Sequence, residues 1–566
     1  MRKRWKLLAA LLLVLALGAG AAVLALTGNP PEEVAELVAE GGEKLLADPL
    51  PPARGAPRVL VFALDGVGAD ELEAVVRGGR APHIAGLLGP PTGEPGVYRH
   101  AYAVPGVLSI LPSTTYAAWT SLFTGEPPAR TGVPGNEWFA REEDRFYAPA
   151  PVSASGFGDA MRVYSDQLMG AVTHAPTLYE RAGVRSYVSL AALQRGASLV
   201  TVPDPGALGE VLAGAARGAA EGAAERELYA ELDESAVESL LETIARRGPA
   251  DLQVVYFPGV DLWTHVAPRP LSDERAYVEE VVDRAVGRVL AAYRRKGALE
   301  GTYVLFVADH GHTPVPYDDA HSLGTDGGDE PAEVLRRAGF RVRPFELEVE
   351  GGDHQAVLAY QGAIAYVYLA DRSTCPRPGD RCDWRRPPRL VEDVLPVARA
   401  FDAAGRTGAG VPALRGALDL VFAREPRPPG AEALPFQVWD GRRLVPVGEY
   451  LAAHPRPDLL RLEERLRGLA AGPWGHHAGD VLLLARAGME LPLERRYYFS
   501  PAQHSWHGSP SDQDSRIPLV VARPGGDGRQ LRGVVRRAVG EHPSQLDVVR
   551  LVLALLGKET TETDRR

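Results

Sequence analysis

The sequence contains only two cysteines, Cys375 and Cys382, in 566 residues. They flank the turn-rich segment Pro-Arg-Pro-Gly-Asp-Arg, and neither has another Cys or a His at metal-ligand spacing, so they indicate a local disulfide and not a zinc site. An excess of positive charge is also lacking, because the net charge is -11, and nothing indicates a nucleic-acid partner. Internal repeats are absent from the sequence.

Charge is missing from one long run near the N-terminus, residues 7–27, which is rich in Leu, Ala and Val and follows the basic residues 1–6. The run is long enough to span a bilayer, and its basic flank is expected to stay in the cytoplasm. We therefore predict a signal anchor over residues 1–28 that holds the rest of the chain on the extracytoplasmic side of the cell membrane, with secretion after signal cleavage as the alternative. No cysteine follows the run, which excludes a lipoprotein anchor. Residues 29–57 are rich in proline and predict a linker with one short helix near residues 32–46.

Apolar runs alternate with helical patterns in the next segment of the chain. Strands are predicted at residues 58–64, 251–256 and 302–308, and helices at residues 235–247 and 273–295. The first of these helices has a capping box, Ser235 with Glu238. This alternation predicts an α/β fold with a mainly parallel central sheet flanked by helices.

The pattern loosens into short elements among Pro- and Gly-rich loops over residues 323–479, which predicts a cap subdomain inserted into the core. The core is expected to resume with a strand at residues 480–485. The predicted catalytic core therefore consists of two segments, 58–322 and 480–557, with the cap at 323–479 between them and a charged tail at 558–566.

Acidic residues follow three of the predicted strands, and histidines accompany them. In open α/β sheets, ligands bind at the carboxyl ends of the strands, and carboxylates gathered there need a cation between them. Asp and His suit zinc or manganese, and six such ligands fit two ions, which can clamp an in-line displacement at phosphorus when they are about 4 Å apart. The candidate ligands are Asp65, Asp261, His265, Asp309, His310 and His507.

Three consecutive hydroxyl residues, Ser113, Thr114 and Thr115, precede a short helical pattern. Anions collect at the positive N-terminal end of a helix, but a hydroxyl is a poor nucleophile until a base or a metal activates it. A structural N-cap is the alternative interpretation of this run. By chemistry alone, either threonine can be the nucleophile.

Taken together, these motifs resemble the alkaline phosphatase superfamily, and most of all its type I phosphodiesterase/nucleotide pyrophosphatase branch. The resemblance covers residues 58–322 and 480–557. The motifs are Leu-Asp-Gly around Asp65, Pro-Ser-Thr-Thr-Tyr around Thr115, Thr-Gly at 124–125, the spaced pair Asp261 and His265, Ala-Asp-His-Gly at 308–311, His-Gly at 507–508 and Ser-Gln-Leu-Asp-Val at 544–548.

The resemblance implies a nucleophile and two metal sites. Thr115 is implied as the nucleophile and as a ligand of one ion, zinc or alternatively manganese. That ion is also held by Asp65, Asp309 and His310, and the second is held by Asp261, His265 and His507. The implied activity is a metal-dependent hydrolysis of phosphate esters, as a phosphodiesterase/nucleotide pyrophosphatase or a phosphatase. The alternatives are a phospho-headgroup transferase on the same core and a non-catalytic surface binding protein.

Two features depart from the family pattern. Ala117 and Ala118 stand where the phosphodiesterases often carry Pro-Asn, and Asn136 in the next loop is the candidate to replace that asparagine as a substrate-binding residue. The Cys-x-Pro-x-Arg or Ser-x-Pro-x-Arg motif of sulfatases is missing, which sets that branch aside. Three further histidines have no match in the family and are expected to lie behind the ligands or on the surface: His312, His321 and His504.

Overall fold

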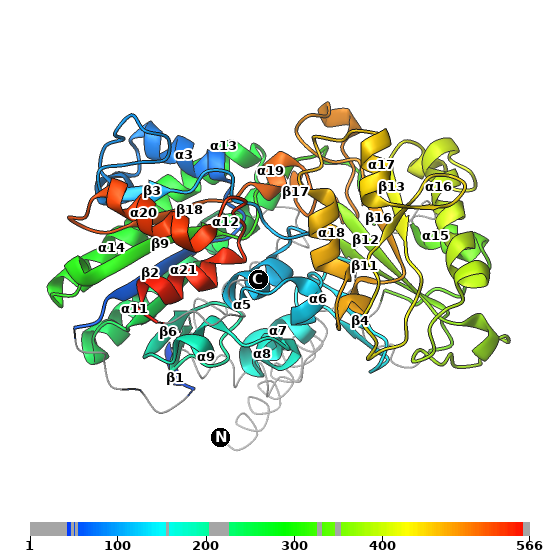
Figure 1. The fold of residues 1–566 in the computed structure, drawn as a ribbon, viewed down its shortest axis with the longest axis horizontal. Coiled ribbons are helices and arrows are strands. Elements are labelled where there is room, and N and C mark those ends of the chain that lie inside the picture. The colour runs from blue at the N-terminus through cyan, green and yellow to red at the C-terminus, as the bar shows by residue number, and fades with distance from the viewer. Residues whose placement is uncertain are drawn as a thin grey trace, which may run out of the picture.

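The computed structural model describes residues 42–46, 50, 55–153, 158–202, 226–324, 331–345 and 352–558. Two large sheets lie side by side in it (Figure 1). The first has eight strands in the order β1-β7-β6-β8-β2-β9-β18-β3. Their bounds in that order are Gly42–Leu45, Leu199–Val202, Ser186–Ser189, Leu252–Phe257, Arg58–Leu64, Thr302–Ala308, Leu519–Ala522 and Ala101–Ala103.

The strands from β7 to β9 run parallel, and β1, β18 and β3 pair antiparallel to their neighbours. The predicted α/β fold with a mainly parallel central sheet is therefore confirmed. β8 and most of β2 and β9 are buried, which explains why their sequences are continuous apolar runs. In the register of the sheet, Leu64 lies opposite both Phe257 and Ala308, so the three strands end at one edge.

Helices cover this sheet, and in Figure 1 α20 and α21 lie in front of it. The helices of this lobe are α3 Ala69–Gly78, α4 Pro82–Leu88, α5 Thr115–Thr124, α6 Pro128–Thr131, α7 Gly158–Ser165, α8 Leu168–Val172, α9 Leu178–Ala182, α11 Arg226–Arg247, α12 Gly259–Val266, α13 Pro270–Tyr277, α14 Asp283–Arg295, α19 Asp512–Ser515, α20 Gly528–Val539 and α21 Asp547–Leu555. A π-helical turn, Val278–Val282, joins α13 to α14, so the single helix predicted there begins earlier and is interrupted.

The second sheet is antiparallel throughout and has six strands in the order β11-β12-β16-β13-β14-β15. Their bounds in that order are Ala356–Gln361, Ile364–Leu369, Val481–Ala485, Leu418–Ala423, Gln437–Trp439 and Leu444–Pro446. The accompanying helices are α15 Pro331–Arg337, α16 Leu395–Thr407, α17 Val447–Ala453 and α18 Leu462–Ala470. Two small hairpins complete the fold: β4 Trp138–Ala140 with β5 Arg145–Tyr147, and β10 Thr313–Pro314 with β17 Ser505–Trp506.

One strand was assigned to the wrong sheet by the sequence. Residues 480–485 were expected to resume the main sheet, but β16 lies in the middle of the second sheet, between β12 and β13. A short apolar run that is buried on both faces fits the centre of either sheet, so its pattern alone does not distinguish them.

The expected membrane anchor over residues 1–28 lies outside the described residues. Among the helices of the described residues, none is long and apolar enough to cross a membrane. Most of the expected linker helix also lies outside them, and its last residues form a strand instead. β1 (Gly42–Leu45) pairs with β7, and the carboxylate of Glu43 binds Arg246 and Arg247 of α11.

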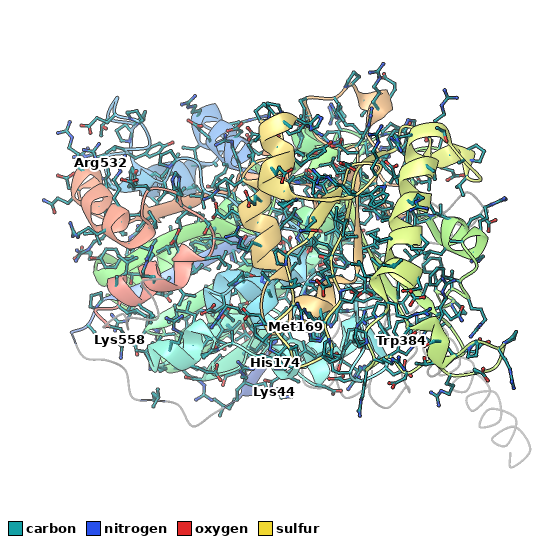
Figure 2. All side chains as sticks on the ribbon, turned by 45° about the vertical axis from the view of Figure 1, so that its right-hand side comes forward. Lys44, Met169, His174, Trp384, Arg532 and Lys558 are labelled. Atoms are coloured by element: carbon teal, nitrogen blue, oxygen red, sulfur yellow. A yellow bond between two sulfur atoms is a disulfide. The ribbon has the colours of Figure 1, made fainter. Side chains whose placement is uncertain are left out.

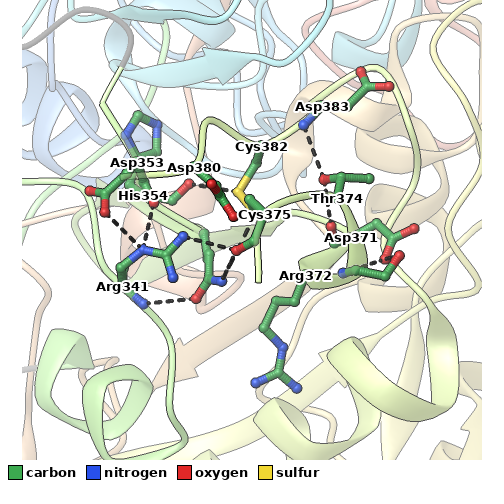
Figure 3. Close-up of a disulfide and its surroundings, with 12 residues drawn as sticks. Arg341, Asp353, His354, Asp371, Arg372, Thr374, Cys375, Asp380, Cys382 and Asp383 are labelled. Atoms are coloured by element: carbon green, nitrogen blue, oxygen red, sulfur yellow. Dashed lines mark hydrogen bonds and ion pairs between the residues drawn. A yellow bond between two sulfur atoms is a disulfide. The ribbon is translucent and has the colours of Figure 1, made fainter. Parts of the chain in front are cut away.

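The predicted disulfide between Cys375 and Cys382 is present (Figure 3). Around it, the carbonyl oxygen of Cys375 accepts hydrogen bonds from Arg341 and Gln355, both at 3.0 Å. The bridge therefore closes a turn that is also tied to the segment leading into β11.

Candidate metal centre

The predicted ligands converge at the shared edge of β2, β8 and β9. Asp65 directly follows β2 and Asp309 directly follows β9, while Asp261 lies in the first turn of α12, just after β8. His265 is four residues after Asp261 and therefore lies on the same face of α12. The structure thus brings the strand-end acids together as the sequence predicts, because parallel strands in register deliver their next residues to one place.

The distances between these groups are those of a ligand cluster. Nε2 of His310 lies 3.5 Å from Asp65 Oδ1 and 3.2 Å from Asp309 Oδ2. Asp261 Oδ1 lies 3.4 Å from His265 Nε2 and 3.8 Å from His507 Nε2. The described residues offer two candidate sets that match the expected division: Asp65 with Asp309 and His310, and Asp261 with His265 and His507.

Two of the three buried carboxylates in this cluster have too few hydrogen-bond donors. Asp65 Oδ1 and Asp309 Oδ2 have no hydrogen-bond partner among the described residues. Burial and the neighbouring carboxylates of Asp309 and Asp261 raise the pKa of Asp65 well above its usual range. Buried anions that repel one another in this way need a cation, so the residues present fit bound divalent ions.

The three histidines are oriented as metal ligands are. Nδ1 of His265 lies 2.8 Å from the carbonyl oxygen of Ser505. Nδ1 of His507 lies 2.9 Å from that of Ser113, and Nδ1 of His310 lies 3.2 Å from that of its neighbour Gly311. A carbonyl only accepts, so each Nδ1 carries a proton, and each ring in its neutral form turns the lone pair of Nε2 toward the carboxylates.

Thr115 is the hydroxyl residue that reaches this centre. It is the first residue of α5, and its Oγ1 lies 3.4 Å from His310 Nε2. Thr114 occupies the N-cap position but makes no side-chain cap, and its buried hydroxyl has no partner among the described residues. The capping interpretation therefore does not describe this run, and of the two threonines it is Thr115 that lies beside a candidate ligand.

Asn136 lies next to the candidate nucleophile. Its side-chain oxygen accepts a hydrogen bond of 3.0 Å from the backbone N–H of Tyr116, one of the donors that a helix N-terminus leaves unsatisfied. Its own N–H donates to Gln361 Oε1, at the end of β11, at 2.7 Å. The neighbouring Gly135 permits this approach, since a Cβ there would lie 2.0 Å from Gln361 Oε1. The sequence pointed to Asn136 and missed Gln361.

His312 is closer to the centre than the sequence suggested. Its Nε2 lies 2.9 Å from Asp261 Oδ1, and its Nδ1 lies 3.1 Å from Ser505 Oγ. Asp261, His310 and His312 form a third candidate metal-binding set. A signal existed in the sequence, because residues two apart on an extended segment, such as His310 and His312, face the same side. His321, by contrast, pairs with Asp318 at 2.7 Å.

Tyr256 is a second residue that the sequence did not single out. Its hydroxyl donates a hydrogen bond to Asp65 Oδ2 from the neighbouring strand β8. This bond leaves Oδ1 as the unpartnered oxygen of Asp65, directed to the group around His310.

Buried carboxylates, imidazoles and a helix-N-terminal threonine gathered at the strand ends of an α/β sheet form a side-chain set that suits divalent ions and chemistry on phosphate esters. Residues 59–376, more than half of the chain, match the family model of type I phosphodiesterase/nucleotide pyrophosphatase. The chain belongs to this family and is a phosphate ester hydrolase of the phosphodiesterase type.

The fold is similar to that of a solved human protein. Human ectonucleotide pyrophosphatase/phosphodiesterase 5 is 13% identical, with 89% of this chain and 96% of that chain covered and a TM-score of 0.50. Its murine counterpart, solved as an inactive variant in complex with AMP, is 13% identical over the same shares of the two chains, with a TM-score of 0.48. No curated protein matches the sequence significantly.

Proposed function

We propose that this protein hydrolyses phosphodiesters of the nucleotide class with Thr115 as the nucleophile and two divalent ions, zinc or manganese, at the strand-end centre. One ion is assigned to Asp65, Asp309, His310 and the Thr115 hydroxyl. The other is assigned to Asp261, His265 and His507. The proposal rests above all on the buried carboxylate oxygens without partners, which face three imidazole Nε2 atoms beside the hydroxyl of Thr115.

When bound, such ions supply positive charge that favours an ionised hydroxyl and offsets the charge that develops at phosphorus. The chain supplies the geometry. Thr115 Oγ1 attacks phosphorus, the bond from phosphorus to the leaving oxygen breaks, and the alcohol or phosphate leaves with a proton. Water then attacks the phosphothreonine, the bond between Thr115 and phosphorus breaks, and the threonine hydroxyl is restored.

The surroundings of Thr115 support anion binding. It begins α5, so the free N–H groups and the positive end of the helix dipole lie near the attacking oxygen. Asn136 uses its oxygen to accept from Tyr116, which leaves the NH2 group of its side chain as the donor that we assign to a non-bridging oxygen of the substrate. Asn136 thereby takes the role that Ala118 is unable to fill.

The test is hydrolysis of p-nitrophenyl phosphate mono- and diesters by the full-length protein. We expect activity that zinc supports and a chelator abolishes, a loss of at least about 10³-fold in Thr115→Ala, and partial retention in Thr115→Ser, which keeps a hydroxyl. Full activity of Thr115→Ala would exclude this mechanism. Product analysis in the presence of alcohols separates a hydrolase, with water as the sole acceptor, from a transferase. A protein that binds zinc but turns over no ester would fit the non-catalytic alternative.

We also propose that the N-terminal run anchors the chain and that the catalytic region faces the extracytoplasmic side. The disulfide supports this placement, since such bonds persist in oxidising compartments. Membrane fractionation combined with protease accessibility of intact cells tests it. A catalytic region that is protected in intact cells and accessible only after lysis would contradict the proposed orientation.

A further inference from the structure

Glu142, His476 and His477 form a second buried cluster of metal-ligating side chains, which shares no residue with the strand-end centre. Glu142 lies in the turn between β4 and β5. The two histidines belong to a 3-10 helix, Gly475–Ala478, that leads into β16. The side chains of the histidines are 7% and 6% exposed and that of Glu142 is 23% exposed, so the carboxylate forms the solvent side of the cluster.

The hydrogen bonds of His477 leave its second nitrogen facing an acceptor. Its Nδ1 lies 2.7 Å from the carbonyl oxygen of Gly132, which only accepts, so Nδ1 carries a proton. Its Nε2 lies 2.7 Å from Glu142 Oε1. In the neutral ring, Nε2 then carries a lone pair that is directed at the carboxylate oxygen. Nε2 and this oxygen are both hydrogen-bond acceptors, so at this separation a positive charge must lie between them. A proton, which makes the ring an imidazolium, or a metal ion can provide that charge.

His476 brings a second ring nitrogen to the same carboxylate, which is the arrangement that a shared metal ion requires. Its Nε2 lies 3.1 Å from Glu142 Oε2, so both histidines direct the same ring atom to one carboxylate. Its Nδ1 has no hydrogen-bond partner among the described residues, so the hydrogen-bonding contact of the ring is the one with this carboxylate. Zinc bound at roughly 2.0–2.1 Å by N and O ligands in a tetrahedron separates them by about 3.3 Å. The observed 2.7 and 3.1 Å would therefore have to lengthen by about 0.6 and about 0.2 Å to hold a zinc ion.

We propose that Glu142, His476 and His477 bind a third divalent ion of the zinc class, with water completing its coordination. Two imidazoles, one carboxylate and one water are a ligand set that zinc commonly takes. The backbone carbonyl of Gly132 behind His477 is the outer partner that fixes a metal-binding tautomer. The proposal does not rest on the proposed function, because no residue of the strand-end centre contributes to it.

The position of the site suggests what the ion does. It would join the β4–β5 turn to the segment that enters the second sheet, next to the buried ion pair of Arg141 and Asp480 at 2.6 Å. It would also hold His477 against Gly132, four residues before Asn136 in the same loop. His174, labelled in Figure 2, stacks with ring centroids 3.6 Å apart on Trp474, the residue directly before this 3-10 helix. The proposed ion therefore has a structural role, because it would hold the loop that carries Asn136 in place.

The experiment measures zinc content of the full-length protein after equilibration with zinc and removal of the excess. Wild type is compared with Glu142→Gln and with the matched control Glu143→Gln. Glu143 is the next residue in the same turn, and its carboxylate accepts a hydrogen bond from the Tyr147 hydroxyl. We expect Glu142→Gln to hold one equivalent less than wild type and Glu143→Gln to hold the wild-type amount. Zinc should raise the melting temperature of wild type and of the control by more than that of Glu142→Gln.

A second arm separates this site from the strand-end centre. In an Asp65→Asn/Asp261→Asn background, one equivalent of zinc should remain, and Glu142→Gln should remove it. Equal zinc content in wild type and Glu142→Gln would overturn the proposal and leave an imidazolium–carboxylate pair in its place. If the double variant fails to fold, the comparison of wild type with the two single variants still decides the question.

Discussion

Asn136 makes two contributions that substitution can separate. Its Oδ1 satisfies the Tyr116 N–H at the start of α5, and its NH2 group is assigned to the substrate. Asn136→Ala removes both. Asn136→Asp keeps an oxygen acceptor for Tyr116 but replaces the donor by a negative charge. We therefore expect the two variants to differ in stability and to resemble each other in lost activity.

The magnitudes follow from burial. Asn136 and Tyr116 are 5% and 9% exposed, so Asn136→Ala leaves a buried N–H without its partner, at a cost of about 1–3 kcal/mol. Loss of a donor that binds charge developing in the transition state lowers kcat by about 10²-fold or more, equivalent to about 2.7 kcal/mol. Asn136→Asp should lose at least as much activity, since its charge repels the phosphate, while it keeps most of the stability.

The assay combines kcat and KM for a p-nitrophenyl diester with thermal melting of the same preparations. The expected pattern is a lower melting temperature for Asn136→Ala alone and a fall in kcat/KM for both variants. If Asn136→Ala melts lower but keeps the wild-type kcat/KM, the residue only caps α5 and the substrate-binding assignment is refuted. If it loses activity but melts as wild type does, the energetic reasoning about the buried N–H is wrong.

Three further predictions address other regions of the chain. His312→Ala should weaken metal retention against a chelator by about 10–100-fold, because the variant loses the contact that orients Asp261. Unchanged sensitivity to the chelator would show that this contact does not contribute to metal binding. Burial raises the pKa of Asp233 from 3.8 to about 8, so the folded form keeps a proton that the unfolded chain loses, and the stability of the protein falls as pH rises from about 4 to 8. Asparagine does not titrate, so the melting temperature of Asp233→Asn relative to wild type should increase steadily across that pH range. A difference in melting temperature that stays constant with pH would contradict this prediction. Replacing both Cys375 and Cys382 by serine removes the disulfide, whose cysteines have a sequence separation of 7 residues. The free energy of unfolding measured in denaturant should fall by about 2.5 kcal/mol, because the unfolded chain gains conformational entropy. An unchanged unfolding midpoint would show that the surrounding hydrogen bonds are sufficient to hold the turn.

Local sequence patterns predicted the strand-end acids because the rule behind them is local. A buried apolar strand followed by Asp65 or Asp309 needs only parallel pairing to bring both carboxylates together. The two cysteines were close enough in sequence for their bridge to be inferred. What the sequence did not reveal depends on contacts between distant segments, such as the hydrogen bond from Asn136 to Gln361, which are 225 residues apart.

The start of α11 was also predicted at the wrong residue, because contacts with distant segments determine it. Ser235 and Glu238 form a capping-box pattern, yet both lie inside α11, which covers Arg226–Arg247. The preceding residues are helix formers, and Asp233 is held by the Gly259 N–H at 3.1 Å and the Tyr277 hydroxyl at 2.9 Å. These tertiary contacts stabilise the helical turns that precede Ser235. A capping motif shows only that a helix can begin at that residue, and it does not exclude an earlier start.

The second sheet helps to position the candidate site even though the family motifs lie mostly outside this sheet. The turn between β11 and β12 contacts the segment that carries His507: the N–H of Ala363 donates to the carbonyl oxygen of His507 at 3.0 Å. A Cβ on Gly362, whose φ is 66°, would lie 2.2 Å from that same oxygen. Gln361 in the same turn holds Asn136. The β11–β12 turn thus positions both a candidate metal ligand and the candidate substrate donor, so substitutions at Gly362 should disturb metal binding and substrate binding together, although neither function uses a side chain at that position.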